Sequence, residues 1–412
     1  MRRRRLLVFV IVGSLLSVSA ASAAAAGPHN GFDSFDWNEV NDDADWVRRA
    51  RLETVALGRD FYLLGGRTPN PPVPPPGDPI PGDSTIWGDV WRSGDRGESW
   101  ELILPTDDAG HWPARAYHEV VTKSGQMFLM GGQNFGLFPN PACDFDPDCF
   151  PKFLPTSEFF NDVWRSPDGV NWTELTADAP WEERAGLSAI VFRGETYVMG
   201  GSFNDDPDVI GGPPTRVLFN DVWKSANGRD WVQLTENAPW DPRAGADLVV
   251  KNGYIYLLGG EFGFTGSPPP YFNDVWRTRD GRNWELVTES ARWSPRPGHT
   301  CDVLRNTIVC FGGFGQSTDP ADPFKPANPM DVWVSKDGAR WMQVSDSPWN
   351  ATKPSEVKYD YDTIVAPAGR DGRGLAIYTF GGDRETFNFF DPTQWLNVDN
   401  DVWRYSLSKN SK

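Results

Sequence analysis

Six short apolar segments recur along the chain, and each of them ends in a pair of glycines. The pairs are Gly65–Gly66, Gly131–Gly132, Gly200–Gly201, Gly259–Gly260, Gly312–Gly313 and Gly381–Gly382. The preceding segments, such as FYLL and YIYLL, are rich in aromatic and aliphatic residues and too short for a helix, which is typical of strands. A DVW triplet follows each pair after a loop of variable length. The pattern predicts a sixfold β repeat.

Each repeat unit is expected to contain four strands, a to d. Strand a follows an arginine, strand b ends in the glycine pair, strand c contains DVW, and strand d contains a second Trp after a Gly-containing turn. In five units the arginine stands 16 residues before the first glycine, as from Arg115 to Gly131. A constant a–b spacing with a variable b–c spacing indicates a propeller blade with one insertion-tolerant loop.

The two ends of the chain complete one unit between them. The last unit stops after the triplet at Trp403 and lacks its second Trp, while Trp37 stands 12 residues before Arg49, as Trp172 does before Arg184. We therefore predict an all-β, six-bladed propeller whose ring is closed by an N-terminal strand. This strand completes the last blade and removes an exposed sheet edge.

The repeat motif resembles a known family. The run R-A-Y-H-x-V-V from Arg115, the strand ending in two glycines and the paired aromatics of strands c and d are similar to the Kelch repeat of Kelch-type and galactose-oxidase-like propellers. The turn from Ser93 to Trp100 also matches part of the Asp-box of sialidase-type propellers. The resemblance covers nearly all of residues 27–412 and implies a single propeller domain there.

Residues 1–26 have the features of a secretory signal peptide. Four arginines precede an apolar stretch of about 13 residues and a run of small residues, and the stretch is shorter than the ~20 residues of a membrane span. We expect a secreted or periplasmic protein in which disulfides persist. The pairs Cys143 with Cys149 and Cys301 with Cys310 are predicted, because different blades hold the two sets apart.

Net charge excludes several classes of partner. The formal charge is −17 and becomes −21 without the four leader arginines, so nucleic-acid or anionic-membrane binding is disfavoured. We expect a monomer without membrane insertion. His118 and His299 occupy the same repeat position, and packing is favoured over metal binding there. The repeated Arg and Trp residues are interpreted as scaffold, although a ring of arginines would also suit a carboxylate or sulfate. The Asp of DVW is expected to bond local backbone.

Residues that differ from blade to blade are the better candidates for function. Those after the glycine pairs and in the b–c loops are expected near the channel mouth, where aromatic rings beside polar groups suit a carbohydrate or a protein epitope. The candidates are Arg67, Gln133, Glu261, Asp383, Trp395, Phe264 and Tyr271. The loop aromatics, Phe262 among them, have a second interpretation, in which they only pack the loops together.

Binding is favoured over catalysis, and the sequence leaves both open. No Ser-His-Asp pattern, P-loop or CxxC motif is present. Sialic-acid mutarotases and sialidases share related folds, so an enzyme acting on acidic sugars is the alternative. Asp144, Asp146 and Asp148 have the D-x-D-x-D rhythm of a calcium loop without the EF-hand frame, so a solvated acidic loop is favoured over a calcium site. No other cofactor is expected.

Overall fold

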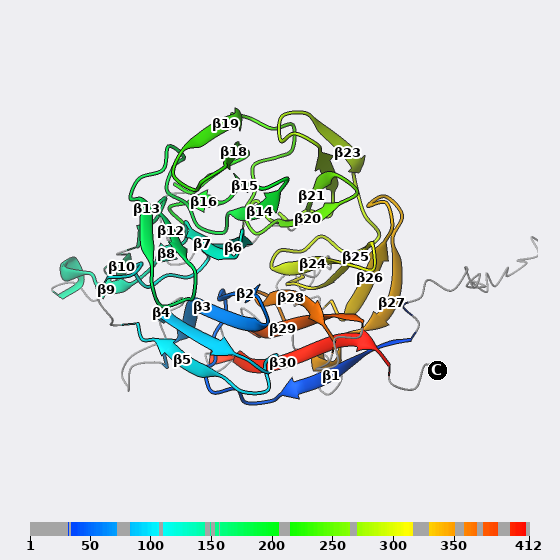
Figure 1. Ribbon diagram of the computed structural model, residues 1–412. Coiled ribbons are helices and arrows are strands. Elements are labelled where there is room, and N and C mark those ends of the chain that lie inside the picture. Colours follow the sequence, from blue (N-terminus) through cyan, green and yellow to red (C-terminus); the bar gives the residue numbers. More distant parts are fainter. Residues whose placement is uncertain are drawn as a thin grey trace, which may run out of the picture.

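The computed structural model describes residues 32, 34–71, 83–106, 110–144, 149, 153–155, 157–205, 215–263, 270–315, 329–350, 358–368, 374–385 and 396–408. Six four-stranded antiparallel sheets surround a central channel (Figure 1). Within these residues the helices are two short 3-10 turns, Pro141–Asp144 and Pro348–Asn350. The predicted six-bladed, all-β fold is confirmed.

The blades follow one another along the chain in the order a, b, c, d. Blade one comprises β2 (Glu53–Leu57), β3 (Asp60–Pro69), β4 (Ser84–Ser93) and β5 (Glu101–Leu104). Blade two comprises β6 (Glu119–Lys123), β7 (Gln126–Met130), β12 (Val163–Ser166) and β13 (Thr173–Thr176). Blade three comprises β14 (Ser188–Phe192), β15 (Glu195–Met199), β18 (Val222–Ser225) and β19 (Trp231–Thr235).

Blades four to six continue the same order. Blade four comprises β20 (Asp247–Lys251), β21 (Tyr254–Leu258), β22 (Val275–Thr278) and β23 (Trp284–Thr288). Blade five comprises β24 (His299–Leu304), β25 (Thr307–Gly312), β26 (Asp331–Ser335) and β27 (Met342–Asp346). Blade six comprises β28 (Asp362–Pro367), β29 (Leu375–Asp383), β30 (Val398–Leu407) and β1 (Phe35–Asn41).

Strand β1 is the outer strand of blade six, as predicted. It pairs antiparallel with β30 near the other end of the chain, so the N-terminal strand closes the ring (Figure 1). The ladder runs from Phe35 opposite Leu407 to Asn41 opposite Val402. Without β1, the polar backbone edge of β30 would be exposed.

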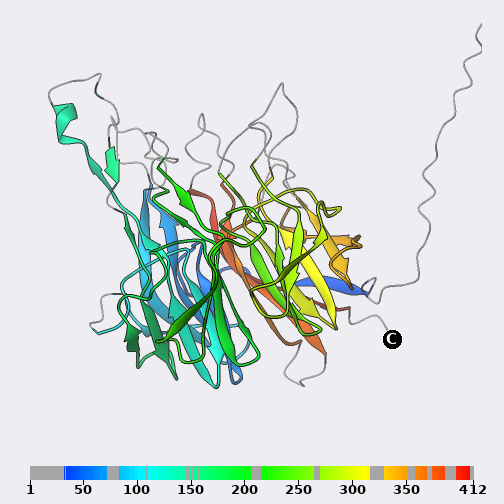
Figure 2. The same cartoon turned by 90° about the horizontal axis from the view of Figure 1, so that it is seen from above.

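The two faces of the ring differ. The a–b and c–d turns lie on one face, here called the turn face, and the b–c and d–a connections lie on the other, the loop face. Three small sheets extend the b–c connections: β8 (Gln133–Asn134) with β11 (Glu158–Phe159), β9 (Leu137–Pro139) with β10 (Phe153–Pro155), and β16 (Ser202–Phe203) with β17 (Val217–Leu218). Figure 2 shows the β9–β10 hairpin reaching outward from the loop face.

Tryptophans lock neighbouring blades together. Each Trp of the d–a connection meets the strand-d Trp of the following blade edge to face, as Trp112 meets Trp172 at 5.9 Å and Trp181 meets Trp231 at 6.0 Å. Both Trp112 and Trp181 are buried. Edge-to-face pairs of this kind contribute about 0.5–1.5 kcal/mol beyond their buried area. The scaffold interpretation of these tryptophans is therefore supported by their contacts.

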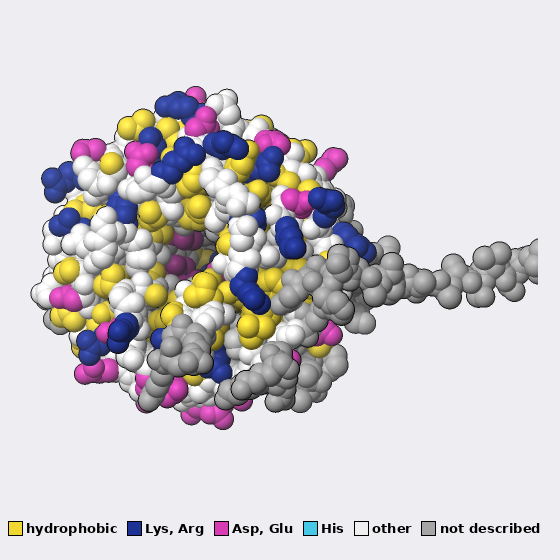
Figure 3. All heavy atoms as spheres, turned by 45° about the vertical axis from the view of Figure 1, so that its right-hand side comes forward, with side chains coloured by type: hydrophobic (Ala, Val, Ile, Leu, Met, Phe, Trp, Pro, Cys, Tyr) yellow, Lys and Arg dark blue, Asp and Glu magenta, His cyan; other side chains and the backbone are white. Residues whose placement is uncertain are grey.

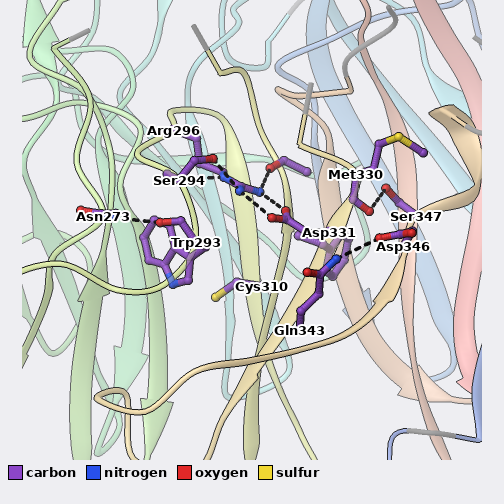
Figure 4. A network of polar contacts seen from close by, with 12 residues as sticks. Asn273, Trp293, Ser294, Arg296, Cys310, Met330, Asp331, Gln343, Asp346 and Ser347 are labelled. Atoms are coloured by element: carbon purple, nitrogen blue, oxygen red, sulfur yellow. Dashed lines mark hydrogen bonds and ion pairs between the residues drawn. The ribbon is translucent and has the colours of Figure 1, made fainter. Parts of the chain in front are cut away.

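A buried Arg–Asp pair clamps strands within five of the blades. In blade five, Arg296 donates to Asp331 Oδ1 at 2.7 Å and to the carbonyl of Gly312 at 3.1 Å (Figure 4). The equivalent pairs are Arg49–Asp89, Arg115–Asp162, Arg184–Asp221 and Arg243–Asp274. In blade six, Lys358 contacts Asp399 and Asp401 instead. These arginines are scaffold.

These pairs show that the DVW aspartate mainly accepts from side chains, and not only from local backbone as expected. Asp162 accepts from Arg115 and from the indole N–H of Trp164 at 2.7 Å. The c–d turn aspartates do bond local backbone, since Asp168 accepts from the N–H groups of Val170 and Asn171. Periodicity alone does not separate these roles, because both residues repeat once per blade.

Both predicted disulfides are present. Cys301 and Cys310 lie opposite each other in the β24–β25 ladder, with Cα atoms 4.1 Å apart. Cys143 joins Cys149 at the tip of the blade-two loop, with Cα atoms 5.0 Å apart. Two disulfides are compatible with an extracellular protein. Within the described ranges, no helix is long and apolar enough to cross a membrane; the predicted signal peptide lies outside those ranges.

Candidate functional site

The residues after the glycine pairs gather at the loop-face mouth of the channel. Those of blades one to four continue strand b by one step and bridge to the start of strand a, as Arg67 does to Ala50, Gln133 to Ala116 and Glu261 to Ala244. Asp383 bridges to Tyr359 in the same way. Repeated backbone geometry therefore brings residues of different character to one ring. We call Arg67, Gln133, Glu261, Asp383 and their ion-pair partners the mouth cluster.

Arg67 joins blade one to blade six. Its guanidinium forms an ion pair with the carboxylate of Asp383 and lies 3.5 Å from Glu385 Oε1. Arg67 is 6% exposed and Asp383 is fully buried. Burial raises the pKa of the Asp383 carboxyl well above its usual range, and repulsion from Glu385 adds to the shift. One guanidinium thus faces two buried carboxyl groups that compete for it.

Glu261 joins blade four to blade three through a residue that the sequence patterns missed. Both of its carboxylate oxygens accept from Arg216, at 2.5 and 3.1 Å, and the Nε of Arg216 donates to Asp205 at 2.8 Å. Arg216 stands just before β17 and has no counterpart in the other repeats. A search for repeated positions could not find it. The signal that could have identified Arg216 is its positive charge within a b–c loop.

Two polar atoms of the mouth cluster have unused hydrogen-bonding capacity. Gln133 is 7% exposed, and its Oε1 has no partner among the described residues. The Nε of Arg67 is likewise buried without a partner in that part of the chain. Leaving such a group unsatisfied costs about 1–3 kcal/mol. Both atoms are therefore suited to a hydrogen-bonding guest.

The aromatic candidates are less exposed than expected. Tyr271, Phe314 and Tyr359 form a buried cluster with ring centroids 6.2 and 5.5 Å apart. Tyr271 is therefore packed against its neighbours and is not an exposed platform, which matches the alternative interpretation for this residue. Phe262 is 54% exposed on the same face. Trp395 and Phe264 lie outside the described residues.

Three further residues lie close to the mouth cluster along the chain. They are Arg51, Tyr117 and Asp360, and each stands two residues after the repeated Arg or Lys at the start of strand a. Their φ values are 52°, 57° and 54°. Arg51 forms an ion pair with Asp360 at 2.5 Å, and its guanidinium lies 4.7 Å from the centroid of the Tyr117 ring. We call these three residues the inner triad.

Two residues of the inner triad, Arg51 and Asp360, also line a cavity of about 250 Å³. Figure 3 shows a central hollow with acidic side chains inside it. The carboxylates lining the cavity are Glu53, Glu119, Asp247, Asp302, Asp360 and Asp362. Burial raises the pKa of Asp302 to about 7 and that of Asp362 to about 6. For Asp302 the neighbouring charge of Asp362 adds to the shift, so the carboxylates at this level of the channel repel one another.

The His, Cys, Asp and Glu side chains were also compared with the requirements of a metal site. No group of three or more His, Cys, Asp or Glu side chains in the described ranges is placed to hold a metal ion. Asp144 ends the 3-10 turn Pro141–Asp144, while Asp146 and Asp148 lie outside those ranges, so the calcium hypothesis stays a prediction. His118 and His299 are buried beside Trp112 and Trp293.

Comparisons with known proteins show distant relatives. No protein-family model matches the chain. It is similar to the "Dynein alpha chain, flagellar outer arm" of Chlamydomonas reinhardtii (23% identity over 68% of this chain), to "Xyloglucanase Xgh74A" of Acetivibrio thermocellus (21% over 68%) and to "Kelch domain-containing protein 1" of Mus musculus (25% over 56%). The chain spans 6%, 31% and 57% of these three relatives, respectively.

Among solved structures, that of YjhT shares the fold. The TM-score is 0.60 at 14% sequence identity, and the match covers 90% of this chain and 98% of YjhT. This likeness concerns the fold alone. Taken with the six four-stranded blades, it establishes that the chain is a six-bladed β-propeller, and the glycine-pair repeats are similar to those of Kelch-domain proteins.

Proposed function

We propose that this protein is an exported binding propeller that holds a carbohydrate at the mouth cluster. The observation that carries the proposal is a pair of buried atoms, Gln133 Oε1 and Arg67 Nε, that have no partner among the described residues and belong to residues that do not repeat from blade to blade. Scaffold residues in this fold repeat and satisfy one another, as the five Arg–Asp clamps do. Residues that break the repeat and keep spare hydrogen-bonding capacity are suited to a ligand.

The chemistry of the cluster suits a hydroxyl-rich ligand. A sugar hydroxyl both donates and accepts, so one group can donate to Gln133 Oε1 or to a carboxylate and accept from the Arg67 Nε–H. Burial raises the pKa of Tyr271 and that of Tyr359, which keeps both phenols neutral at physiological pH. A few convergent polar groups beside apolar rings are the usual composition of a small-molecule site.

Relatives lend general support. Kelch propellers generally bind protein partners, and one relative of this chain is named as a xyloglucanase, a name that refers to a polysaccharide. These similarities are too low to transfer a ligand. A protein partner on the loop face is therefore the competing form of the binding proposal.

A glycan array probed with the purified protein tests the proposal. We expect selective retention on a subset of saccharides, and Gln133→Leu should abolish it because the side chain keeps its approximate volume but loses its amide. The matched control is Gln343→Leu in β27, an outer strand far from the mouth cluster. Absence of retention on every glycan would contradict carbohydrate binding, and would leave a protein ligand as the explanation for the cluster.

Catalysis on an acidic sugar is the second candidate. It is favoured by Glu261 and Asp383, whose pKa values burial raises, because such carboxyl groups are suited to proton transfer. The carboxyl-to-amide variants Glu261→Gln and Asp383→Asn separate the two candidates. Binding alone predicts an unchanged bound sugar with either variant. Turnover of a sialic-acid anomer or a glycoside by the native protein, lost in either variant, would establish the enzyme.

A further inference from the structure

We propose that the inner triad, Asp360, Arg51 and Tyr117, forms the base of the mouth-cluster ligand site and selects an uncharged saccharide. The inference rests on the proposed carbohydrate binding and assigns to it both a set of contact residues and a ligand class. The alternative is that the triad only fills the channel and stabilises the fold. The two roles predict different responses to glycine substitution.

The repeat itself shows that the fold does not need these side chains. Their position in every blade has a left-handed backbone, and blades three to five fill it with Gly186, Gly245 and Gly298 at φ 57°, 58° and 61°. Glycine adopts this conformation without the steric strain that other residues incur. Blades six, one and two instead place Asp360, Arg51 and Tyr117 in this strained backbone conformation. Strained non-glycine residues of this kind concentrate at functional sites.

The triad is adjacent to three of the candidate site residues through the backbone. Arg51 follows Ala50, which bridges to Arg67, and Tyr117 follows Ala116, which bridges to Gln133. In blade six, Asp360 follows Tyr359, which bridges to Asp383. Blades six, one and two therefore each carry one triad residue and one of Asp383, Arg67 and Gln133.

The triad side chains also interact as one unit. Besides the Arg51–Asp360 ion pair and the Arg51–Tyr117 contact, the backbone N–H of Arg51 donates to the Asp360 carbonyl at 2.8 Å. Burial raises the pKa of the Tyr117 phenol, while the charge of Arg67 lowers it and that of Asp383 raises it, so the ring lies within electrostatic range of the mouth cluster. The Nε of Arg51 is buried without a partner in the described part of the chain.

Charge pairing at this site disfavours an anionic ligand. Three guanidinium groups, of Arg51, Arg67 and Arg216, face five carboxyl groups. The carboxyl groups are Asp205, Glu261, Asp360, Asp383 and Glu385. Each guanidinium is already paired, and the formal charge of the site is negative because carboxyl groups outnumber guanidinium groups. A ligand carboxylate needs an unpaired guanidinium to bind, and here it would instead be repelled. Hydroxyl groups, in contrast, can donate to the carboxylates and accept from the Nε–H groups of Arg51 and Arg67, which have no partner in the described part of the chain.

Glycine substitution of the triad distinguishes a role in ligand binding from a role in stabilising the fold. We would prepare Tyr117→Gly and the double variant Arg51→Gly/Asp360→Gly, which removes both charges together. Because three blades already carry glycine at this position, we expect an unchanged or higher melting temperature together with at least a tenfold loss of saccharide affinity. The matched control is Asn252→Gly, at φ 51° in an a–b turn on the turn face, which should leave affinity unchanged.

The probes are methyl glycosides of glucose, galactose and mannose and the corresponding methyl uronosides, measured by titration calorimetry and saturation-transfer NMR. Each pair differs only in a hydroxymethyl group or a carboxylate. Binding of a neutral glycoside with at least tenfold preference over its uronoside, lost in the triad variants, is the expected result. Equal or tighter binding of the uronoside overturns the selectivity while carbohydrate binding stands. Unchanged affinity in the triad variants, or a lowered melting temperature alone, overturns the assignment of the triad. Failure of every glycoside to bind overturns the proposed function itself.

Discussion

Trp37 lies directly opposite Tyr405 in the β1–β30 ladder, with the two ring centroids 4.9 Å apart. This contact joins the two ends of the chain. Phe35 lies beside the same tyrosine at 5.3 Å and is buried. The ring is therefore held closed by hydrogen bonds of the β1–β30 ladder together with an aromatic cluster that spans both termini.

Removal of β1 should destabilise the whole propeller. Deletion of residues 1–40 exposes the edge of β30 and the ring of Tyr405, and we expect a loss of several kcal/mol from buried area at about 25 cal/mol per Å². Denaturant unfolding measures it. Deletion of residues 1–31 is the control, because it keeps β1. Equal stability of the two truncated proteins would contradict closure by β1.

The buried Arg–Asp clamps should be costly to break and less costly to replace. Asp162→Asn leaves Arg115 buried beside an uncharged amide, and we expect a loss of about 3–5 kcal/mol. The double variant Arg115→Met/Asp162→Leu removes both charges and should unfold at a higher denaturant concentration than Asp162→Asn. A single variant as stable as the native protein would show that the clamp contributes nothing.

His299 should make the protein sensitive to acid. Burial, with repulsion from Arg296, lowers the pKa of His299 to about 3, and burial likewise lowers that of His118 well below its usual range. The unfolded chain then binds more protons than the folded one between pH 6.5 and about 3. Stability should fall by up to about 1.4 kcal/mol per pH unit as the pH drops through this window. Blades one and three carry Leu at this position. His299→Leu should therefore reduce the dependence of the unfolding free energy on pH between 6.5 and about 3.

Asp302 should act in the opposite direction. Burial raises its pKa to about 7, so the folded state binds more protons than the unfolded chain between about pH 4 and 7, and stability declines as the pH rises. Asp302→Asn removes the buried charge at this position and its repulsion from Asp362. We expect it to raise the unfolding free energy by about 1–2 kcal/mol at pH 8, with little change at pH 4. A loss of stability at pH 8 would indicate that the carboxylate is paired in solution.

The two disulfides can be checked by peptide mapping. We expect Cys143–Cys149 and Cys301–Cys310 with no free thiol. On the loop-entropy model, Cys301→Ser/Cys310→Ser should cost about 2–3 kcal/mol because the ring it opens is small. The double variant at Cys143 and Cys149 serves as a comparison in a peripheral loop. A link between residues of different pairs would contradict the fold of blades two and five.

Much of the fold could be read from the spacing of a few residue types. The glycine pairs, the DVW triplets and the distance from Trp37 to Arg49 were sufficient for six blades and for closure by β1. Cys301 and Cys310 flank a turn between two adjacent strands, so their pairing followed from the same repeat. Repetition makes such inferences possible, because each position is observed up to six times in one chain.

The candidate site could be predicted only in part. Arg67, Gln133, Glu261 and Asp383 were found because they differ from blade to blade, and the structure brings them to one mouth. Arg216 and the inner triad were not. Arg216 belongs to a loop without a repeat, and the triad is recognised only when left-handed backbone angles are compared across blades.

The sequence by itself determined the architecture of this protein, because blade packing depends on local periodicities of aromatic, glycine and charged residues that a single chain displays. Only the tertiary structure decided which charges meet. The Arg67–Asp383, Arg216–Glu261 and Arg51–Asp360 pairs join different blades, and their residues are far apart in the chain. The physical reason is that ring closure, and not local sequence, sets the distances between blades at the channel. The site is consequently a product of the closed ring.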